Sequence, residues 1–266
     1  MTSFTIMDVG HGSCCYLVAS NSNLMLFDCG HKSDPENRPT DELASLGHNS
    51  VELLAITNYD EDHISDIANL RDRLNIRQLR RNKSITAEQL RALKLKQSGE
   101  ISPAMESLLD MMSDYTGGPL NPAPDFPSTT RTCFQNSHPF GSGDDTNNIS
   151  IVTLLDVHDD TFLIPGDIEK EGWERLLESA PNLRSRLSDV TVYIASHHGR
   201  TNGYCEDIFT QHNCRPNVFV FSDDSKQYST QESNELYRQW AKGIQFNGET
   251  RKILTTRKDG TLTWNW

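Results

Sequence analysis

Several features that would place the chain in a membrane or exported class are missing from its 266 residues. No apolar run reaches the roughly 18 residues that a membrane-spanning helix needs. The N-terminal segment alternates Phe4, Ile6 and Val9 with polar residues, instead of placing a basic region before an apolar stretch. The six cysteines show no Cys-x-x-Cys spacing and no paired framework, which argues against a zinc ribbon and a disulfide scaffold. We therefore expect a soluble, cytoplasmic protein without membrane contact and with reduced, mostly buried thiols.

Two common catalytic signatures are missing as well. No Gly-x-Ser-x-Gly turn is present, and Ser196 cannot form a triad pair with His197 merely by adjacency. No Gly-x-x-x-x-Gly-Lys loop is present to cradle a phosphate. These absences argue against a serine hydrolase and against a P-loop protein.

Positive charge is scarce overall but concentrated in one window. The net charge of −12 argues against unselective binding of nucleic acid, because an acidic surface repels phosphate. Between Arg71 and Lys96, nine basic residues stand against two acidic ones, which leaves this window at +7 and the remainder at −19. The window is either the solvated face of two helices or a rim that guides phosphates. The substrate-binding candidates on the second interpretation are Arg80, Arg81, Lys83 and, in a later loop, Lys226.

The most informative pattern is a buried strand that ends in metal-ligand residues. An apolar run at residues 51–57 leads directly into Asn58-Tyr59-Asp60-Glu61-Asp62-His63. Two later runs end in the same way, in Gly166-Asp167 and in Ser196-His197-His198-Gly199. Strands that each deliver a carboxylate or an imidazole, with glycine allowing close backbone approach, build a rigid metal centre. Each segment alone has a simpler interpretation: a solvated loop, a helix N-cap at Asp167, and a buried histidine beside an exposed one. Together they predict a metal centre.

The rest of the pattern predicts one α/β domain over residues 1–266, with residues from about 75 to 135 forming an insertion or cap over the site. Strands are expected at residues 4–9, 15–18, 24–27, 148–155, 161–164 and 217–221, and before His197. Helices are expected at residues 65–74, 86–96, 170–179 and 230–240, with Thr86 and Thr230 as N-caps. A final hairpin pairs residues 252–256 with 261–264 across an Asp-Gly turn.

Seven short motifs occur in a fixed order outside residues 75–135: Asp8-Val9-Gly10-His11-Gly12-Ser13, Phe27-Asp28-Cys29-Gly30, residues 57–63, Asn147-Asn148-Ile149-Ser150, Ile164-Pro165-Gly166-Asp167, Ser196-His197-His198-Gly199 and Asp259-Gly260. This series resembles the metallo-β-lactamase fold, and most closely the hydrolase domain attached to the DNA-uptake competence protein ComEC. The resemblance implies an αββα sandwich with a metal site at one edge.

Matching the motifs residue by residue implies a set of metal ligands: Asp60, Asp62, His63, Asp167 and His197. Three neutral residues replace histidines found elsewhere in the family and count as weak or supporting ligands: Asn58, Asn148 and Ser150. Asp28 is expected to orient a ligand histidine, and His11, where the competence branch usually has Gln, to be structural.

This donor set, with three carboxylates and two imidazoles, should hold one or two divalent ions. It favours Mn²⁺ or Mg²⁺, and zinc is not excluded. The catalytic candidates are Asp62, as a ligand of the ion that activates water, and His198, as a donor to a substrate oxygen or a general acid.

Three functions follow as alternatives. The first is a metal-dependent phosphodiester hydrolase, a nuclease acting on DNA, because the resemblance implies it. The second is a phosphodiesterase for a small cyclic nucleotide beneath the predicted cap. The third is a catalytically decayed module that binds a protein partner in a larger assembly, with Asn58 and Ser150 marking the lost site.

Overall fold

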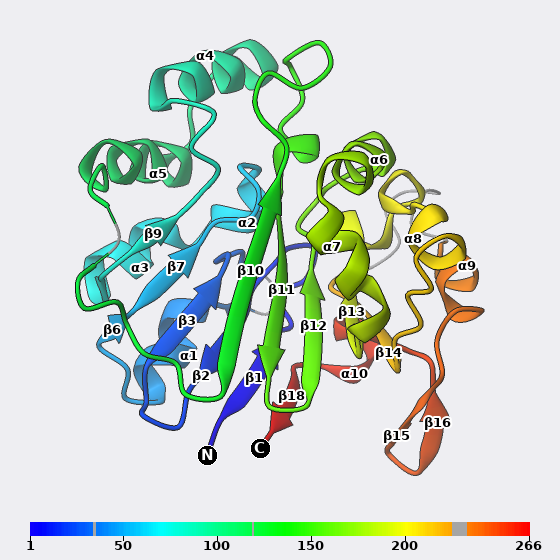
Figure 1. Ribbon diagram of the computed structural model, residues 1–266. Coiled ribbons are helices and arrows are strands. Elements are labelled where there is room, and N and C mark those ends of the chain that lie inside the picture. The colour runs from blue at the N-terminus through cyan, green and yellow to red at the C-terminus, as the bar shows by residue number, and fades with distance from the viewer. Residues whose placement is uncertain (34–35, 119, 225–232) are drawn as a thin grey trace.

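The computed structural model describes residues 1–33, 36–118, 120–224 and 233–266, and Figure 1 shows two β-sheets flanked by helices. The first sheet has the order β18-β1-β2-β3-β7-β9. Its strands are β18 (Leu262–Asn265), β1 (Ser3–Ile6), β2 (Cys15–Val18), β3 (Leu24–Phe27), β7 (Leu53–Ala55) and β9 (Leu79–Arg80). Because β3, β7 and β9 run parallel, the loops after Phe27 and Ala55 leave the same edge of the sheet.

The second sheet has the order β10-β11-β12-β13-β14-β17. Its strands are β10 (Thr129–Gln135), β11 (Ile151–Val157), β12 (Asp160–Ile164), β13 (Val192–Ile194), β14 (Val218–Phe221) and β17 (Ile253–Thr255). The four strands from β12 to β17 are parallel, so the loops after Ile164, Ile194 and Phe221 also meet at one edge.

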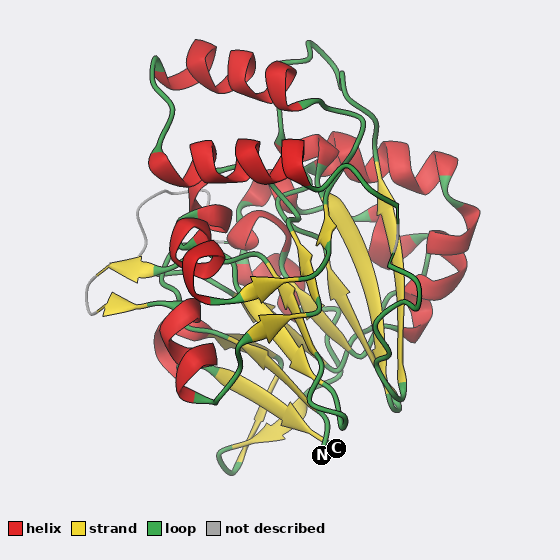
Figure 2. Cartoon of the chain, turned by 90° about the vertical axis from the view of Figure 1, so that its left-hand side faces the viewer, coloured by secondary structure: helices red, strands yellow, loops and turns green. Residues whose placement is uncertain are grey.

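Helices cover the outer face of each sheet, as Figure 2 shows from the side. Over the first sheet lie α1 (Pro39–Ser45), α2 (Glu61–Ile64), α3 (Ile67–Arg73), α4 (Ala87–Ser98) and α5 (Pro103–Asp114). Over the second lie α6 (Lys170–Ser179), α7 (Pro181–Arg186), α8 (Asp207–Thr210) and α9 (Asn234–Arg238). Among the described helices, none is both long and apolar enough to cross a membrane.

The shorter elements connect these layers: β4 (Lys32–Ser33), β5 (Glu36–Asn37), β6 (Ser50–Val51), β8 (Asn75–Ile76), β15 (Ile244–Phe246), β16 (Glu249–Arg251), α10 (Thr256–Asp259) and the 3₁₀ turns η1 (Asn147–Ile149), η2 (Leu187–Asp189), η3 (Ser196–Gly199) and η4 (Thr201–Gly203).

Three apolar clusters hold the layers together. Phe4, Phe27 and Phe162 are fully buried between the two sheets. Ile67 of α3 and Leu108 of α5 pack on the outer face of the first sheet, and Trp173 of α6 packs on the second. The fold is therefore the αββα sandwich that the motif series implied.

The ends of the predicted cap differ from the expectation. Residues 79–80 and 129–135 are edge strands of the two sheets, and the described chain between them contributes the helices α4 and α5 and no further helix or strand. The predicted N-cap Thr86 forms a capping box with Gln89. Leu90 and Leu93 of α4 are buried against the first sheet, whereas Leu95 is 43% exposed.

One other element also differs. The predicted final hairpin is wrong: β17 pairs with β14 in the second sheet and β18 with β1 in the first, because α10 between them carries the chain across the sandwich. The helix predicted at residues 65–74 is observed as α3, and the separate short helix α2 precedes it. Thr230 lies outside the described residues, and α9 corresponds to the helix predicted at residues 230–240.

Candidate metal centre

The first part of the site is the turn after β7, which enters the short helix α2 and carries Asp62 and His63. Backbone hydrogen bonds fix this turn to the neighbouring strands. Ser13 N donates to the Asp62 carbonyl at 3.1 Å, and Cys29 N donates to the His63 carbonyl at 2.8 Å. At Gly30 an added Cβ would lie 2.0 Å from the Asp62 carbonyl oxygen, so only glycine permits this approach.

The second part comes from the parallel strands of the other sheet. Asp167 follows β12 after a glycine, and its backbone N donates to Ser150 Oγ at 3.2 Å. His197 and His198 follow β13 in the turn η3, with φ angles of 50° and 53°. Such left-handed angles are uncommon for histidine and concentrate at functional sites.

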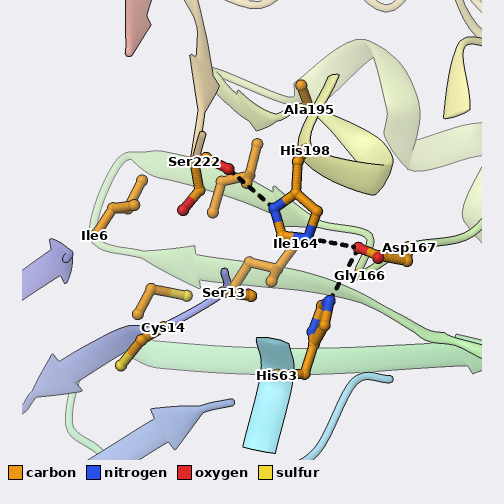
Figure 3. Close-up of a pocket in the computed structure, with 12 residues that line it drawn as sticks. Ile6, Ser13, Cys14, His63, Ile164, Gly166, Asp167, Ala195, His198 and Ser222 are labelled. Atoms are coloured by element: carbon orange, nitrogen blue, oxygen red, sulfur yellow. Dashed lines mark hydrogen bonds and ion pairs between the residues drawn. The ribbon is translucent and has the colours of Figure 1, made fainter. Parts of the chain in front are cut away.

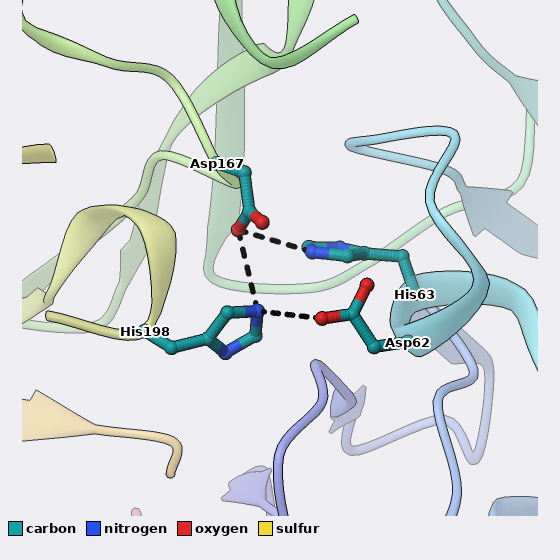
Figure 4. A group of neighbouring side chains, drawn as sticks. All are labelled: Asp62, His63, Asp167 and His198. Atoms are coloured by element: carbon teal, nitrogen blue, oxygen red, sulfur yellow. Dashed lines mark ion pairs between the residues drawn. The ribbon is translucent and has the colours of Figure 1, made fainter. Parts of the chain in front are cut away.

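These segments bring together one ligand atom from each of Asp62, His63, Asp167 and His198, all within 4.8 Å of one another. His63 Nε2 lies 3.0 Å from Asp167 Oδ1. His198 Nε2 lies 3.3 Å from Asp62 Oδ2 and 3.5 Å from Asp167 Oδ1. Figure 4 shows the two carboxylates and the two imidazoles converging on one point.

The cluster fits a metal ion by its donors and by their burial. The Nε2 atoms of His63 and His198 are buried without a hydrogen bond of normal geometry in the described part of the chain. His63, Asp167 and His198 line a small cavity of about 20 Å³ together with Ser13 and Cys14 among others (Figure 3). Two imidazole nitrogens and two carboxylate oxygens form an established donor set for a divalent transition metal.

The charges of these groups shift one another's pKa values. Burial alone would lower the pKa of His198, but Asp167 and Asp62 outweigh it and raise the pKa to about 10. The pKa of His63 is likewise raised above its usual range by Asp167 and Asp28, against burial. Burial would raise the pKa of Asp62, yet the hydrogen bond to His198 and the charge of His63 lower it to about 2. Without metal, the cluster therefore pairs two imidazolium ions with two carboxylates.

Buried acceptors fix the orientation of both imidazoles. His63 Nδ1 donates to Asp28 Oδ2 at 2.8 Å, and Asp28 also accepts from Thr57 N at 2.7 Å and from Thr57 Oγ1 at 2.5 Å. His198 Nδ1 donates to the Ser222 carbonyl at 2.9 Å. These bonds leave both Nε2 atoms facing the carboxylates, which is the arrangement of a histidine ligand with a supporting acceptor.

Two of the implied ligands, Asp60 and His197, are placed outside the cluster. Asp60 forms an ion pair with Lys94 of α4 and accepts from Thr146 at 3.2 Å. His197 is buried beside the cluster, with Nε2 3.8 Å from Asp167 Oδ2, but its ring lies between Arg200 and Glu169, at 3.2 and 3.3 Å. The imidazole that joins the cluster is that of His198. The role of His197 as a ligand stays a prediction. The role of His198 as a proton donor stays a prediction.

The three neutral residues expected as weak ligands support the loops around the site. Asn58 donates to Asn147 Oδ1 at 2.9 Å and to Ser150 Oγ at 3.2 Å, and its own Oδ1 accepts from Asp60 N at 2.8 Å. Asn148 Oδ1 accepts from Gly172 N at 2.9 Å at the start of α6. These contacts hold the turn after β7 against the second sheet.

The basic window divides into paired and unpaired cations. Five of its cations form ion pairs with carboxylates: Arg71, Arg73, Arg91, Lys94 and Lys96. Of the substrate-binding candidates, Arg80 and Lys83 line a groove at the edge of the sheets, whereas Arg81 donates to the backbone carbonyls of Asn82 and Ile85. Lys226 lies outside the described residues.

Two residues at the site were not assigned to it from the sequence. Arg200 donates to His11 Nε2 at 3.0 Å as well as to His197. His11 lies 3.8 Å from Asp62 Oδ2, and burial together with His198 lowers its pKa to about 4, so it is a neutral acceptor. The adjacency of His11 to Gly10 and Gly12, in a turn that meets the metal segment, is the one signal the sequence offers for it.

A two-sheet sandwich whose strand ends converge on a buried carboxylate and imidazole cluster defines a metal-binding α/β protein. Residues 9–203 match the metallo-beta-lactamase superfamily, so the chain belongs to this superfamily of metallohydrolases. No curated protein matches the chain.

Two solved structures, YhfI and CmlA, agree with this assignment of the fold. The metallo-beta-lactamase fold protein YhfI from Bacillus subtilis is 10% identical, with a TM-score of 0.52 over 99% of this chain and 98% of its own. CmlA, a diiron beta-hydroxylase from Streptomyces venezuelae, is 11% identical, with a TM-score of 0.51 over 99% of this chain and 54% of its own. Igni18, a metallo hydrolase from the archaeon Ignicoccus hospitalis, is 13% identical, with a TM-score of 0.49 over 99% of both chains.

Proposed function

We propose that this protein is a metal-dependent phosphodiester hydrolase that cleaves DNA with water as the nucleophile. The observation that carries the proposal is the group of half-buried Asp62 and buried His63, Asp167 and His198, whose ligand atoms lie within 4.8 Å of one another. The likeness of the motif series to the hydrolase domain of ComEC supports DNA as the substrate. Bound at this group, a divalent ion would supply an activated water and stabilise charge on the phosphoryl oxygens.

The arrangement favours Zn²⁺ or Mn²⁺ over Mg²⁺. With Asp60 paired to Lys94 and His198 turned inward, the donors are two nitrogens and two oxygens. Mg²⁺ prefers an octahedral shell of oxygens, including several waters, whereas imidazole suits the transition metals. We therefore revise the preference for Mn²⁺ or Mg²⁺ drawn from the implied ligands.

Arg200 supplies positive charge beside the cluster. Its guanidinium group contacts the ring nitrogens of two imidazoles, at 3.0 Å to His11 and 3.2 Å to His197. A guanidinium fixed in this way suits a phosphate oxygen, because it presents donors in a rigid fork. We assign Arg200 to orienting the phosphodiester and His11 to positioning Arg200.

The test combines elemental analysis of the purified protein with cleavage assays on single- and double-stranded DNA in Zn²⁺, Mn²⁺ or Mg²⁺. Asp62→Ala is the site variant, and Asp72→Ala, an exposed aspartate on α3, is its matched control. We expect metal-dependent cleavage in the native protein and in Asp72→Ala, and none in Asp62→Ala. Cleavage of a cyclic dinucleotide but not of DNA would show that the substrate is a cyclic nucleotide. A protein that retains no metal and cleaves neither would overturn the proposal in favour of an interaction module.

A further inference from the structure

A groove runs along the two edge strands that face each other across the sandwich, β9 and β10. It consists of two adjoining cavities of about 370 and 330 Å³, which share Leu53, Gln78 and Arg131 in their walls. A long, open depression suits a linear ligand better than a compact one. This groove is separate from the cavity beneath the metal cluster, with which it shares no lining residue.

Four cations line the groove: Arg77, Arg80, Lys83 and Arg131. In the described part of the chain none of them forms an ion pair, whereas the other cations of the basic window, except Arg81, do. Asp114, the acidic residue in the first cavity, is paired with Arg71 at 2.9 Å. Four cations without an ion pair thus line one groove, against the single further carboxylate of Asp125 in the second cavity, and the resulting positive field attracts an anion.

Two of these cations each keep one buried N–H group without a partner in the part of the chain that the structure describes, although Arg80 also donates through Nη2 to Gln135 Oε1 at 3.4 Å. Arg80 Nε and Arg131 Nη1 are buried without a hydrogen-bond partner among the described residues. Burial lowers the pKa of Arg131, and repulsion from Arg80 adds to this effect, so the two guanidinium groups lie close to each other. Buried, unpaired donors of like charge are costly, and an anion with several acceptor oxygens would relieve that cost.

We propose that this groove binds single-stranded nucleic acid and guides it along the sheet edge toward the metal turn. The partly buried rings of Tyr115 and Phe126 line one cavity each, so aromatic surface for contact with a base lies beside the cationic track. Arg80 is next to that turn, since its carbonyl accepts from Ile56 N at 2.9 Å. The biological role of this groove rests on the proposed nuclease function, whereas its binding of a strand can be tested without cleavage.

The test measures binding of fluorescein-labelled oligo-dT to the full chain in a metal chelator, so that no turnover is required. Arg77 and Lys83 are exposed, and the double variant Arg77→Gln/Lys83→Gln should weaken binding by about tenfold to a hundredfold. Native binding through four phosphates should fall with salt at a logarithmic slope of about −3, and this slope should be roughly halved in the variant. The control Arg73→Gln/Arg91→Gln removes the same charge from ion-paired positions and should change binding less than twofold.

Three results would overturn the inference: no binding of oligo-dT at low salt, equal weakening by both double variants, or equally tight binding of poly-glutamate, which would assign the groove to an acidic protein. Its failure is distinguishable from that of the proposed function. If Arg77→Gln/Lys83→Gln weakens binding but the native protein cleaves no DNA, only the proposed nuclease function is contradicted. If the protein cleaves DNA but this variant binds oligo-dT normally, only the groove proposal is contradicted.

Discussion

Single residues at the metal centre are held by buried hydrogen bonds. Asp28 fixes the ring of His63, and the Ser222 carbonyl fixes that of His198, so each presents Nε2 to the carboxylates. The two adjacent histidines have opposite surroundings: His198 faces Asp62 and Asp167, whereas His197 contacts Arg200 and Glu169. The motif series aligns the ligand with His197, whereas the observed cluster contains His198.

This reversal predicts different results for two alanine variants. His198→Ala should lose a ligand and weaken Zn²⁺ or Mn²⁺ binding more than a hundredfold, whereas His197→Ala should cost about 10–100-fold at most, as loss of a supporting residue does. Titration of each variant against a metal-sensitive dye measures both affinities, with the exposed His158→Ala as control. If His197→Ala abolishes binding and His198→Ala does not, the ligand implied by the motif alignment is correct.

The secondary-structure elements place the centre where loops of both sheets meet. β7 delivers Asp62 and His63, β12 delivers Asp167, and β13 delivers His198. Parallel neighbours send their loops to one edge of each sheet, so residues far apart in sequence become adjacent. The metal turn then packs against the turn after β1 and the end of β3, where Gly30 leaves room for the Asp62 carbonyl.

Gly30→Ala should therefore disturb the metal site, although Gly30 supplies no ligand. Its Cβ would lie 2.0 Å from a backbone oxygen, so the metal turn must shift. We expect a loss of about 1–3 kcal/mol in the free energy of unfolding, as in overpacked cores, and weaker metal binding. Urea unfolding and metal titration measure the two effects. Gly117→Ala, where nothing lies within 4 Å of the added Cβ, should change neither. Unaltered metal affinity in Gly30→Ala would show that the turn is not held there.

At the scale of the whole molecule, the buried cluster links stability to pH. The pKa of His198 is raised from 6.5 to about 10, so its stabilising effect is complete below pH 6.5 and is lost as the pH rises toward 10. The pKa of Asp62 is lowered from 3.8 to about 2, so its effect is present above pH 3.8 and is lost as the pH falls toward 2. These two groups thus favour the metal-free fold most between about pH 4 and 6.5.

We therefore expect the Tm of the metal-free protein to fall between pH 6.5 and 9, by roughly 2–4 °C for each kcal/mol lost. A saturating divalent metal requires neutral imidazoles and should raise Tm increasingly over the same range. Differential scanning calorimetry with and without chelator measures both trends, and His198→Gln should flatten the metal-free curve. A metal-free Tm that rises from pH 6.5 to 9 would contradict the charge state assigned to the cluster.

The sequence by itself determined the class of fold and most of the strands, because apolar runs that end in ligand residues are local signals. Residues 15–18, 24–27 and 170–179 are predicted at their observed bounds, and Thr86 caps its helix as expected. Asp62, His63 and Asp167 were likewise placed together from their positions after strands.

Only the tertiary structure decided which neighbours those residues meet. Asp60 forms an ion pair with Lys94, 34 positions away, and no local sequence pattern predicts this contact. The cations of the basic window are paired or unpaired according to carboxylates on other elements, such as Asp41, Glu106 and Asp114. The last two strands belong to different sheets because partners at the N-terminus and in β14 outcompete the nearby strand. Each of these outcomes depends on long-range packing, whereas sequence patterns report on local geometry.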